Sequence, residues 1–263
     1  MNFLIIPWDP DPVIFSLGPL SVRWYGVLFA SGFLFGYIIM RKIFKNEGIG
    51  DAVLDRLTVY MAVATIVGAR LGHCLFYEPA YYLSNPLEIL YIWHGGLASH
   101  GAAIAIPISL WLFVRKERKP IVWILDRIAI VVPLAGALIR LGNLMNSEIY
   151  GIETTLPWGF VFLRNGENSP KHPTQIYEAL AYLAIFLLFI WIYWRKKGKF
   201  IPGVLTSLFF ILVFTARFFI EYVKEDQVAF EAGMKLNMGQ LLSIPFVVGG
   251  LIFLILSLRR KAT

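Results

Sequence analysis

Charged residues and cysteine are both scarce in this 263-residue chain, and each scarcity excludes a class of protein. Only 16% of the residues are charged and 58% are hydrophobic, whereas a soluble domain is about 25% charged and about 45–50% apolar. Cys74 is the single cysteine, so no disulfide within the chain can staple a small secreted fold. The sequence also lacks HExxH and paired-cysteine motifs, so we expect no metal and no cofactor.

Long apolar runs account for the hydrophobic excess. Roughly 20 residues cross the hydrocarbon core of a bilayer, and seven runs reach that length. No Ser/Gly/Pro-rich linker divides them, so we expect one domain over 1–263. The first run lacks a basic segment before it and a small-residue cleavage site after it, which predicts a retained helix. Spanning helices are expected near 22–40, 52–77, 96–114, 120–139, 176–194, 201–221 and 238–258.

Basic residues gather directly after the first, third, fifth and seventh runs. The intervening connections contain few bases, and this alternation follows the positive-inside rule. It explains the net charge of +7 better than a phosphate-binding face does, so we expect no nucleic-acid partner. The sequence predicts an all-α integral membrane protein with seven transmembrane helices, its N-terminus outside and its C-terminus in the cytoplasm. The clusters are 41–45, 115–119, 195–199 and 259–261.

The densest group of polar residues follows the fourth run. On a helix, Arg140, Asn143 and Ser147 would share one face. A guanidinium beside amides can bind a phosphate, and it stays charged when partly buried. The alternative is an arginine that snorkels to the interface before a solvated loop. Asn146 and Glu148 lie so close that this alternative explains the group less well.

Two further groups lie at the ends of the fifth and sixth runs. Thr174 is expected to cap the fifth run, and Glu178 either belongs to that first turn or holds an arginine by a charge-assisted bond. Arg217 and Glu221 are four residues apart and can pair on one helix. The alternative is that Arg217 forms a second phosphate clamp facing Arg140.

A histidine inside an apolar run can act as an acid or base near neutral pH, or can be a hydrogen-bonded core residue. His100 is such a residue, and it follows glycines that allow close backbone approach. Tyr25 opens the first run, as an interfacial anchor or as a phenol beside an outward cavity. A metal site is conceivable only with His73, His94, His100 and His172.

Three other arginines lie inside the runs. Arg70 is deep in the second run and needs an acidic or carbonyl partner. Arg56 and Arg127 lie early in the second and fourth runs, where both can snorkel to the cytoplasmic surface.

In this order, the motifs resemble the prolipoprotein diacylglyceryl transferase family. The resemblance spans nearly the whole chain, and 140–151 looks like the family signature. The matching motifs are Asp11–Phe15, Trp24–Gly26, Gly68–Gly72, His94–Gly101, Gly136–Gly151, His172–Glu178, Arg217–Glu221 and Asn237–Gln240.

The resemblance implies a multi-pass protein of the bacterial cytoplasmic (inner) membrane, with an active site facing the periplasm or outer leaflet. It also implies a small extracytoplasmic head, about 148–171, between helices four and five. The implied substrates are phosphatidylglycerol, drawn from the surrounding membrane lipids, and the lipobox cysteine in the signal peptide of a preprolipoprotein. The implied products are a diacylglyceryl thioether and glycerol-1-phosphate.

By motif position, the resemblance also assigns functional residues. Val213, Lys224 and Arg23 depart from residues expected in some members. We expect the two arginines of the motifs to bind the phosphodiester and His100 to act as base, with Tyr25 the weaker choice. A transporter that uses intramembrane Arg, His and Glu is the alternative. The assigned residues are Tyr25, His100, Arg140, Asn143, Asn146, Glu148, Gly151, His172, Glu178, Arg217 and Glu221.

Overall fold

The computed structural model describes residues 6–262 except 19, 93–94, 227–230 and 232. All seven apolar runs are helical in it, and most boundaries lie within a few residues of those expected. Six of these helices, all but α4, are long and apolar enough to cross a membrane. The seven helices are α1 (Trp24–Asn46), α2 (Asp51–Phe76), α4 (Ser99–Glu117), α5 (Ile121–Met145), α6 (Thr174–Arg195), α7 (Val204–Ile220) and α8 (Met238–Ala262).

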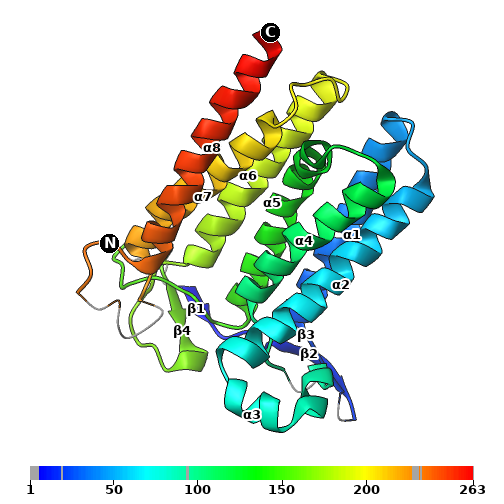
Figure 1. The fold of residues 1–263 in the computed structure, drawn as a ribbon. Coiled ribbons are helices and arrows are strands. Elements are labelled where there is room, and N and C mark those ends of the chain that lie inside the picture. The colour runs from blue at the N-terminus through cyan, green and yellow to red at the C-terminus, as the bar shows by residue number, and fades with distance from the viewer. Residues whose placement is uncertain (1–5, 19, 93–94, 227–230, 232, 263) are drawn as a thin grey trace. The chain divides into compact units, whose positions relative to one another are not determined.

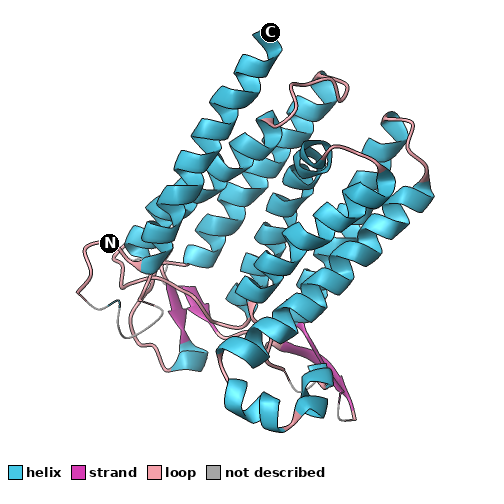
Figure 2. Cartoon of the chain, in the orientation of Figure 1, coloured by secondary structure: helices cyan, strands magenta, loops and turns pink. Residues whose placement is uncertain are grey.

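Short strands and turns occupy the connections, so the expectation of a purely helical chain is incomplete (Figure 2). β1 pairs with β4 in parallel, and β2 pairs with β3 in antiparallel fashion. These elements are β1 (Ile6–Trp8), β2 (Val13–Leu17), β3 (Leu20–Arg23), α3 (Pro79–Ser84), η1 (Pro86–Leu90), β4 (Phe160–Phe162), η3 (Leu163–Asn165) and η4 (Glu221–Val223).

The chain divides into two compact units, of which the first comprises Met1–Ile39 and Leu125–Thr263. In this unit α7 packs on α6 and α8, as Figure 1 shows. α5 is the most interior of the candidate spans, with 44% of its apolar window buried against 17% for α8. Close approaches explain why small residues line α5, since Gly136 contacts the Tyr182 ring of α6. α5 therefore holds polar side chains away from lipid.

The connection between α5 and α6 packs against the N-terminal strand. Phe160 and Phe162 of β4 form a buried cluster with Leu144, and Trp8 covers it. The Trp8 indole Nε1 donates to the Leu144 carbonyl oxygen at 2.9 Å, which ties the strand to the last turn of α5. Hydrophobic burial thus packs β4 and the N-terminal strand against the last turn of α5.

The second unit is Met40–Ile124. Its core is the pair α2 and α4, which cross where both helices have glycine. A Cβ added at Gly101 would lie 2.7 Å from the Cα of Gly72, so no larger residue fits either helix there. Close backbone approach is therefore found at Gly101, whereas a Cβ at Gly95, before the third run, would meet nothing within 4 Å.

Candidate functional site

The densest polar group lies at the C-terminal end of α5. Arg140 and Asn143 are one turn apart on the helix, and the Arg140 Nη1 donates to Asn143 Oδ1 at 3.2 Å. The predicted face is wrong in one respect, because α5 ends at Met145. Ser147 lies beyond that end with a φ of 54°, so it does not continue the helical face.

Glu178, near the start of α6, is fully buried and faces Arg140. The Arg140 Nε lies 2.9 Å from Glu178 Oε2, an ion pair whose angle is not that of a hydrogen bond. Tyr182, one turn further along α6, also interacts electrostatically with Arg140. The prediction that Glu178 pairs with an arginine is confirmed as an ion pair, whereas the expected charge-assisted hydrogen bond is not formed.

Glu178 also belongs to a longer alternating series of charges. Lys224 Nζ lies 3.4 Å from Glu178 Oε1 and 3.1 Å from Glu221 Oε1. Glu221 Oε1 in turn lies 3.4 Å from the Arg217 Nε, which confirms the predicted pair at the end of α7. We name the series Arg140, Glu178, Lys224, Glu221 and Arg217 the charge network.

The charge network is buried at its centre. The side chains of Glu178, Lys224 and Glu221 are 0%, 3% and 6% exposed, whereas Arg217 is 34% exposed. Burying a lone charge is costly, so each carboxylate is placed between two cations. The arrangement contains three cations and two carboxylates. The excess positive charge of the charge network and the partly exposed Arg217 side chain suit an anion.

Glu148 organises the amides beside Arg140. Its Oε1 accepts hydrogen bonds from Asn143 Nδ2 at 2.8 Å and Asn146 Nδ2 at 3.2 Å. Its backbone carbonyl accepts from Gln175 Nε2 at 2.7 Å. Each asparagine NH₂ has two hydrogens, so each keeps a second N–H for another acceptor.

Gly151 and His172 lie side by side in the connection. The Gly151 N–H donates to the His172 carbonyl at 2.8 Å, and the His172 Nδ1 lies 3.1 Å from the Tyr177 hydroxyl. A Cβ at Gly151 would lie 2.7 Å from the His172 Cβ and would meet the Val223 carbonyl oxygen. Burial lowers the pKa of His172 below its usual value. Gly151 therefore has a steric role in bringing this connection onto the end of α7.

The expected cap of α6 is wrong. Thr174 is the first residue of the helix, and Pro173 takes the N-cap position. The Thr174 hydroxyl instead donates to the Ile149 carbonyl at 2.9 Å. Ile149 lies in the connection between α5 and α6, shortly after the end of α5. The threonine thus fixes the connection that contains Glu148, and does not cap its own helix.

Several residues that surround the carboxylates were given no role from the sequence, although Asn237–Gln240 is among the matching motifs and Lys224 among the departures. Asn237 Nδ2 donates to Glu221 Oε2 at 3.2 Å, and Gly239 lies so close that a Cβ there would be 2.6 Å from Glu221 Oε1. Lys224 is the centre of the charge network. A lysine three residues after a glutamate at a helix end was the available signal.

Tyr25, at the start of α1, contacts the same end of α5. Its ring lies against Gly142, where a Cβ would be 2.9 Å from the Tyr25 Cδ2. The side chain is half-buried. The structure therefore brings together every assigned residue of the first unit at the ends of α5, α6 and α7.

His100 belongs to the second unit. It is exposed near the start of α4, with its ring centroid 5.3 Å from that of Phe76 and 5.6 Å from that of Tyr77. His94, named above among conceivable metal ligands, is outside the described residues. Within the described residues no group of three or more His, Cys, Asp or Glu side chains could hold a metal.

Arg70 has the carbonyl partners that its depth predicts. Its guanidinium donates to the carbonyls of Glu88, Ile89 and Gly95 at 2.6, 3.0 and 2.6 Å. The residue is 3% exposed, and it also stacks over the Tyr82 ring at 5.0 Å. One arginine therefore satisfies the backbone of the connection between α2 and α4.

The other two arginines also have partners. Arg56 forms an ion pair with Glu117, the Nε lying 2.6 Å from Oε1. Arg127 is buried, with its guanidinium 5.2 Å from the Phe200 ring centroid. Neither arginine belongs to the charge network.

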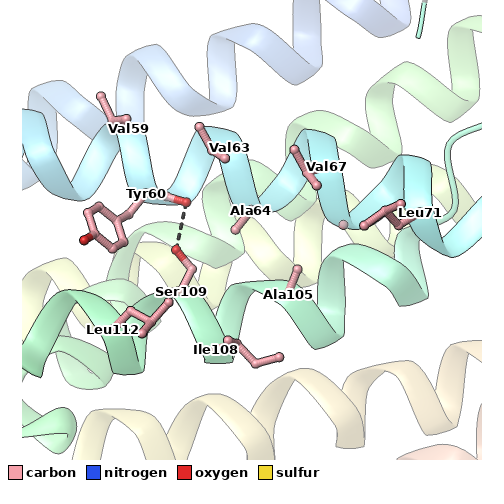
Figure 3. Close-up of a pocket in the computed structure, with 11 residues that line it drawn as sticks. Val59, Tyr60, Val63, Ala64, Val67, Leu71, Ala105, Ile108, Ser109 and Leu112 are labelled. Carbon is pink, nitrogen blue, oxygen red and sulfur yellow. Dashed lines mark hydrogen bonds between the residues drawn. The ribbon is translucent and has the colours of Figure 1, made fainter. Parts of the chain in front are cut away.

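An apolar groove lies elsewhere, between α2 and α4 of the second unit. Figure 3 shows it lined by apolar side chains such as Val63, Val67 and Ile108. Its volume is about 410 Å³. Ser109 is its polar residue besides Tyr60, and its hydroxyl donates to the Tyr60 carbonyl. No charged residue is among the side chains that line this groove.

Six apolar helices and a buried charge network at the ends of α5, α6 and α7 define a multi-pass membrane protein with a polar site inside its helices. Comparison with known proteins then identifies the family of this protein. The profile of the family described as prolipoprotein diacylglyceryl transferase matches residues 12–256. The chain belongs to this family and is a transferase.

Several relatives are similar over almost their whole length. The chain is 50% identical to the phosphatidylglycerol–prolipoprotein diacylglyceryl transferase of Tolumonas auensis, covering 97% of this chain and 98% of that one. Identity is 47% to the protein of the same name from Porphyromonas gingivalis, over 98% and 96%, and 41% to that from Bacteroides fragilis, over 100% and 99%. These names support the transferase and not the transporter.

Proposed function

We propose that this protein transfers the diacylglyceryl group of phosphatidylglycerol to the lipobox cysteine of a preprolipoprotein. The names of the relatives state both substrate classes. The proposal places the chain in the bacterial inner membrane as one domain with seven spanning helices, the seventh being α4. The basic clusters support an N-terminus outside and a C-terminus inside. Residues 148–171 would then form a small head on the outer side.

The observation that supports this function most directly is the charge network. Lys224 links both carboxylates, and each carboxylate faces one of the two arginines, from α5 and from α7. In the described part of the chain, Glu221 is the ion-pair partner of Arg217, which leaves terminal N–H groups for a substrate. Guanidiniums bind phosphate in a bidentate manner, so two of them can hold a phosphodiester.

The reaction follows from that placement. A thiolate sulfur of the lipobox cysteine attacks the glyceryl carbon bonded to the phosphate oxygen. The S–C bond forms, the C–O bond breaks, and the electron pair leaves with glycerol-1-phosphate. Arg140 and Arg217 stabilise the negative charge that develops on the phosphate, with the second N–H groups of Asn143 and Asn146 as further donors.

The substrate supplies the nucleophile, so the enzyme needs none of its own. This agrees with Cys74, which is buried within α2. A free thiol ionises near pH 8.5, so either a base or the field of the two arginines must favour the thiolate at neutral pH. We assign this role to His100, and the weaker assignment is Tyr25, whose phenol is a poor base.

The test uses purified protein, phosphatidylglycerol and a lipobox peptide, with release of glycerol phosphate as the readout. Arg140→Ala should lower turnover about 10²–10³-fold, the loss typical of one preorganised donor to a developing anion. Arg56→Ala removes another ion-paired arginine from a spanning helix and should retain activity. Normal turnover of Arg140→Ala would refute the phosphate clamp, whereas normal turnover of His100→Gln would remove only the base assignment.

The orientation has its own test. Arg164 is in the proposed head, and Lys197 lies in a basic cluster. In a Cys74→Ala background, a membrane-impermeant maleimide should label Arg164→Cys in spheroplasts and label Lys197→Cys only after lysis. The reverse pattern would overturn the orientation.

A further inference from the structure

Asp126 is a buried carboxylate that the reaction above does not use. It lies in the second turn of α5, far along that helix from Arg140, and is 0% exposed. Its Oδ2 accepts a hydrogen bond from the Gly203 N–H at 2.7 Å. Its Oδ1 accepts from the Thr206 N–H at 2.9 Å and from the Thr206 hydroxyl at 2.7 Å.

These bonds cap the N-terminus of α7 from another helix. The first N–H groups of a helix have no partner within it, and a carboxylate there is also favoured by the helix dipole. Gly203 occupies the N-cap with a φ of 91° and has no side chain to cap with. A Cβ at Gly203 would lie 2.5 Å from the Ser257 Oγ and 2.9 Å from the Phe253 Cζ of α8. The start of α7 is thus fixed between α5 and α8.

Equal residue spacings along α5 and α7 connect this contact to the charge network. Fourteen residues separate Asp126 from Arg140 along α5, and fourteen separate Gly203 from Arg217 along α7. At 1.5 Å per residue, each arginine lies about 21 Å along its helix from the capped end. Both helices run away from that end, so bonding at Asp126 brings the two guanidiniums to the same height.

A shift of α7 by one turn would be about 5.4 Å, which exceeds any contact distance in the charge network. The packing of α7 on its neighbours is largely apolar, and apolar contacts are not directional. Hydrogen bonds to one carboxylate are directional and are strong when buried, so they define one register where the apolar surfaces allow several.

We propose that Asp126, acting through Gly203 and Thr206, is a positioning residue that sets the axial register of α7 against α5 and thereby the separation of Arg140 and Arg217. The expected effect of this residue on turnover rests on the proposed function. The expected effect on the distance between the helices does not, so the two proposals can be tested separately.

The first test removes one hydroxyl at a time from two neighbouring residues in the first turn of α7. Thr206→Val removes one of the three bonds to Asp126 with little change in shape, and Thr206→Ser restores the hydroxyl. Ser207→Ala is the matched control, because the Ser207 hydroxyl donates at 2.6 Å to the Gly203 carbonyl within its own helix. We expect Thr206→Val to raise the KM for phosphatidylglycerol about tenfold, the scale of one charge-assisted hydrogen bond, with the KM for the peptide unchanged. Thr206→Ser and Ser207→Ala should match the unmodified protein.

The second test measures the separation directly. Spin labels at Leu141→Cys and Phe219→Cys, both exposed positions beside the arginines, are placed in a Cys74→Ala background. The distance distribution should be narrow in this background and should shift or broaden with Asp126→Asn or Thr206→Val, but not with Ser207→Ala.

Unchanged distances in both variants would overturn the proposal, as would an equal loss of activity in Thr206→Val and Ser207→Ala. If the Asp126→Asn variant does not fold, the Thr206→Val variant alone tests the proposal. If the unmodified protein transfers no diacylglycerol, the proposed function fails while the distances still test the register.

Discussion

Replacement of Lys224 by methionine tests the charge network where it is most buried. The change keeps the length of the side chain and removes the ammonium that contacts both carboxylates. Glu178 and Glu221 would then face each other across apolar atoms, each with one arginine remaining. The expected effects are a loss of stability and a change in the separation of the two arginines.

The magnitude follows from burial and from the remaining partners. Removing one member of a buried ion pair costs about 3–5 kcal/mol, because an uncompensated charge stays behind. The Lys224 side chain is 3% exposed, so solvent screens little of this cost. Since Arg140 and Arg217 still neutralise part of the charge, we expect the lower end, about 3 kcal/mol of unfolding free energy.

The measurement is an unfolding titration in mixed detergent micelles, with glycerol phosphate release assayed in parallel. Lys224→Arg retains the charge and should recover most of the stability. Lys235→Met is the matched control, because Lys235 is exposed and should cost less than about 0.5 kcal/mol. A cost for Lys224→Met no greater than that of Lys235→Met, together with normal turnover, would refute the reasoning.

Three further outcomes are expected. Burial lowers the pKa of His172, so the unfolded chain binds the proton more readily than the folded protein does. The unfolding free energy should therefore fall as pH drops below about 6.5. A titration in which His172→Gln shows the same pH dependence would contradict this. Gly151→Ala should cost about 1–3 kcal/mol of unfolding free energy and lower the melting temperature and turnover, since its Cβ would meet the His172 Cβ and the Val223 carbonyl. An unchanged melting curve would contradict the steric role. Arg70→Met should make the 78–95 connection sensitive to limited proteolysis, because several carbonyls lose their donor, and cleavage no faster than in the unmodified protein would refute that role.

Much of the helical framework was predictable from the sequence, because lipid requires each crossing segment to satisfy its own backbone. Apolar length alone therefore located seven helices, of which α2 differs from its expected bounds by one residue at each end. The i, i+4 spacing predicted the pair of Arg217 and Glu221 because helix geometry is local. The same locality explains why Arg140 and Asn143 were expected to be neighbours.

Relations between distant residues were decided by the tertiary structure. Nothing local connects Lys224 with Glu178, 46 residues earlier, and the salt bridge forms because the ends of α6 and α7 meet. Thr174 looked like a helix cap, yet it is the first residue of α6 and its hydroxyl donates to the Ile149 carbonyl of another segment.

The sequence by itself determined which segments are helical and which residue types are available for binding an anion, since both follow from local geometry and from the cost of burying charge. The tertiary structure decided which carboxylate faces which cation and which helix end Asp126 caps. Those contacts depend on the register of helices that apolar packing alone leaves free to slide, and directional bonds between buried polar groups select one register.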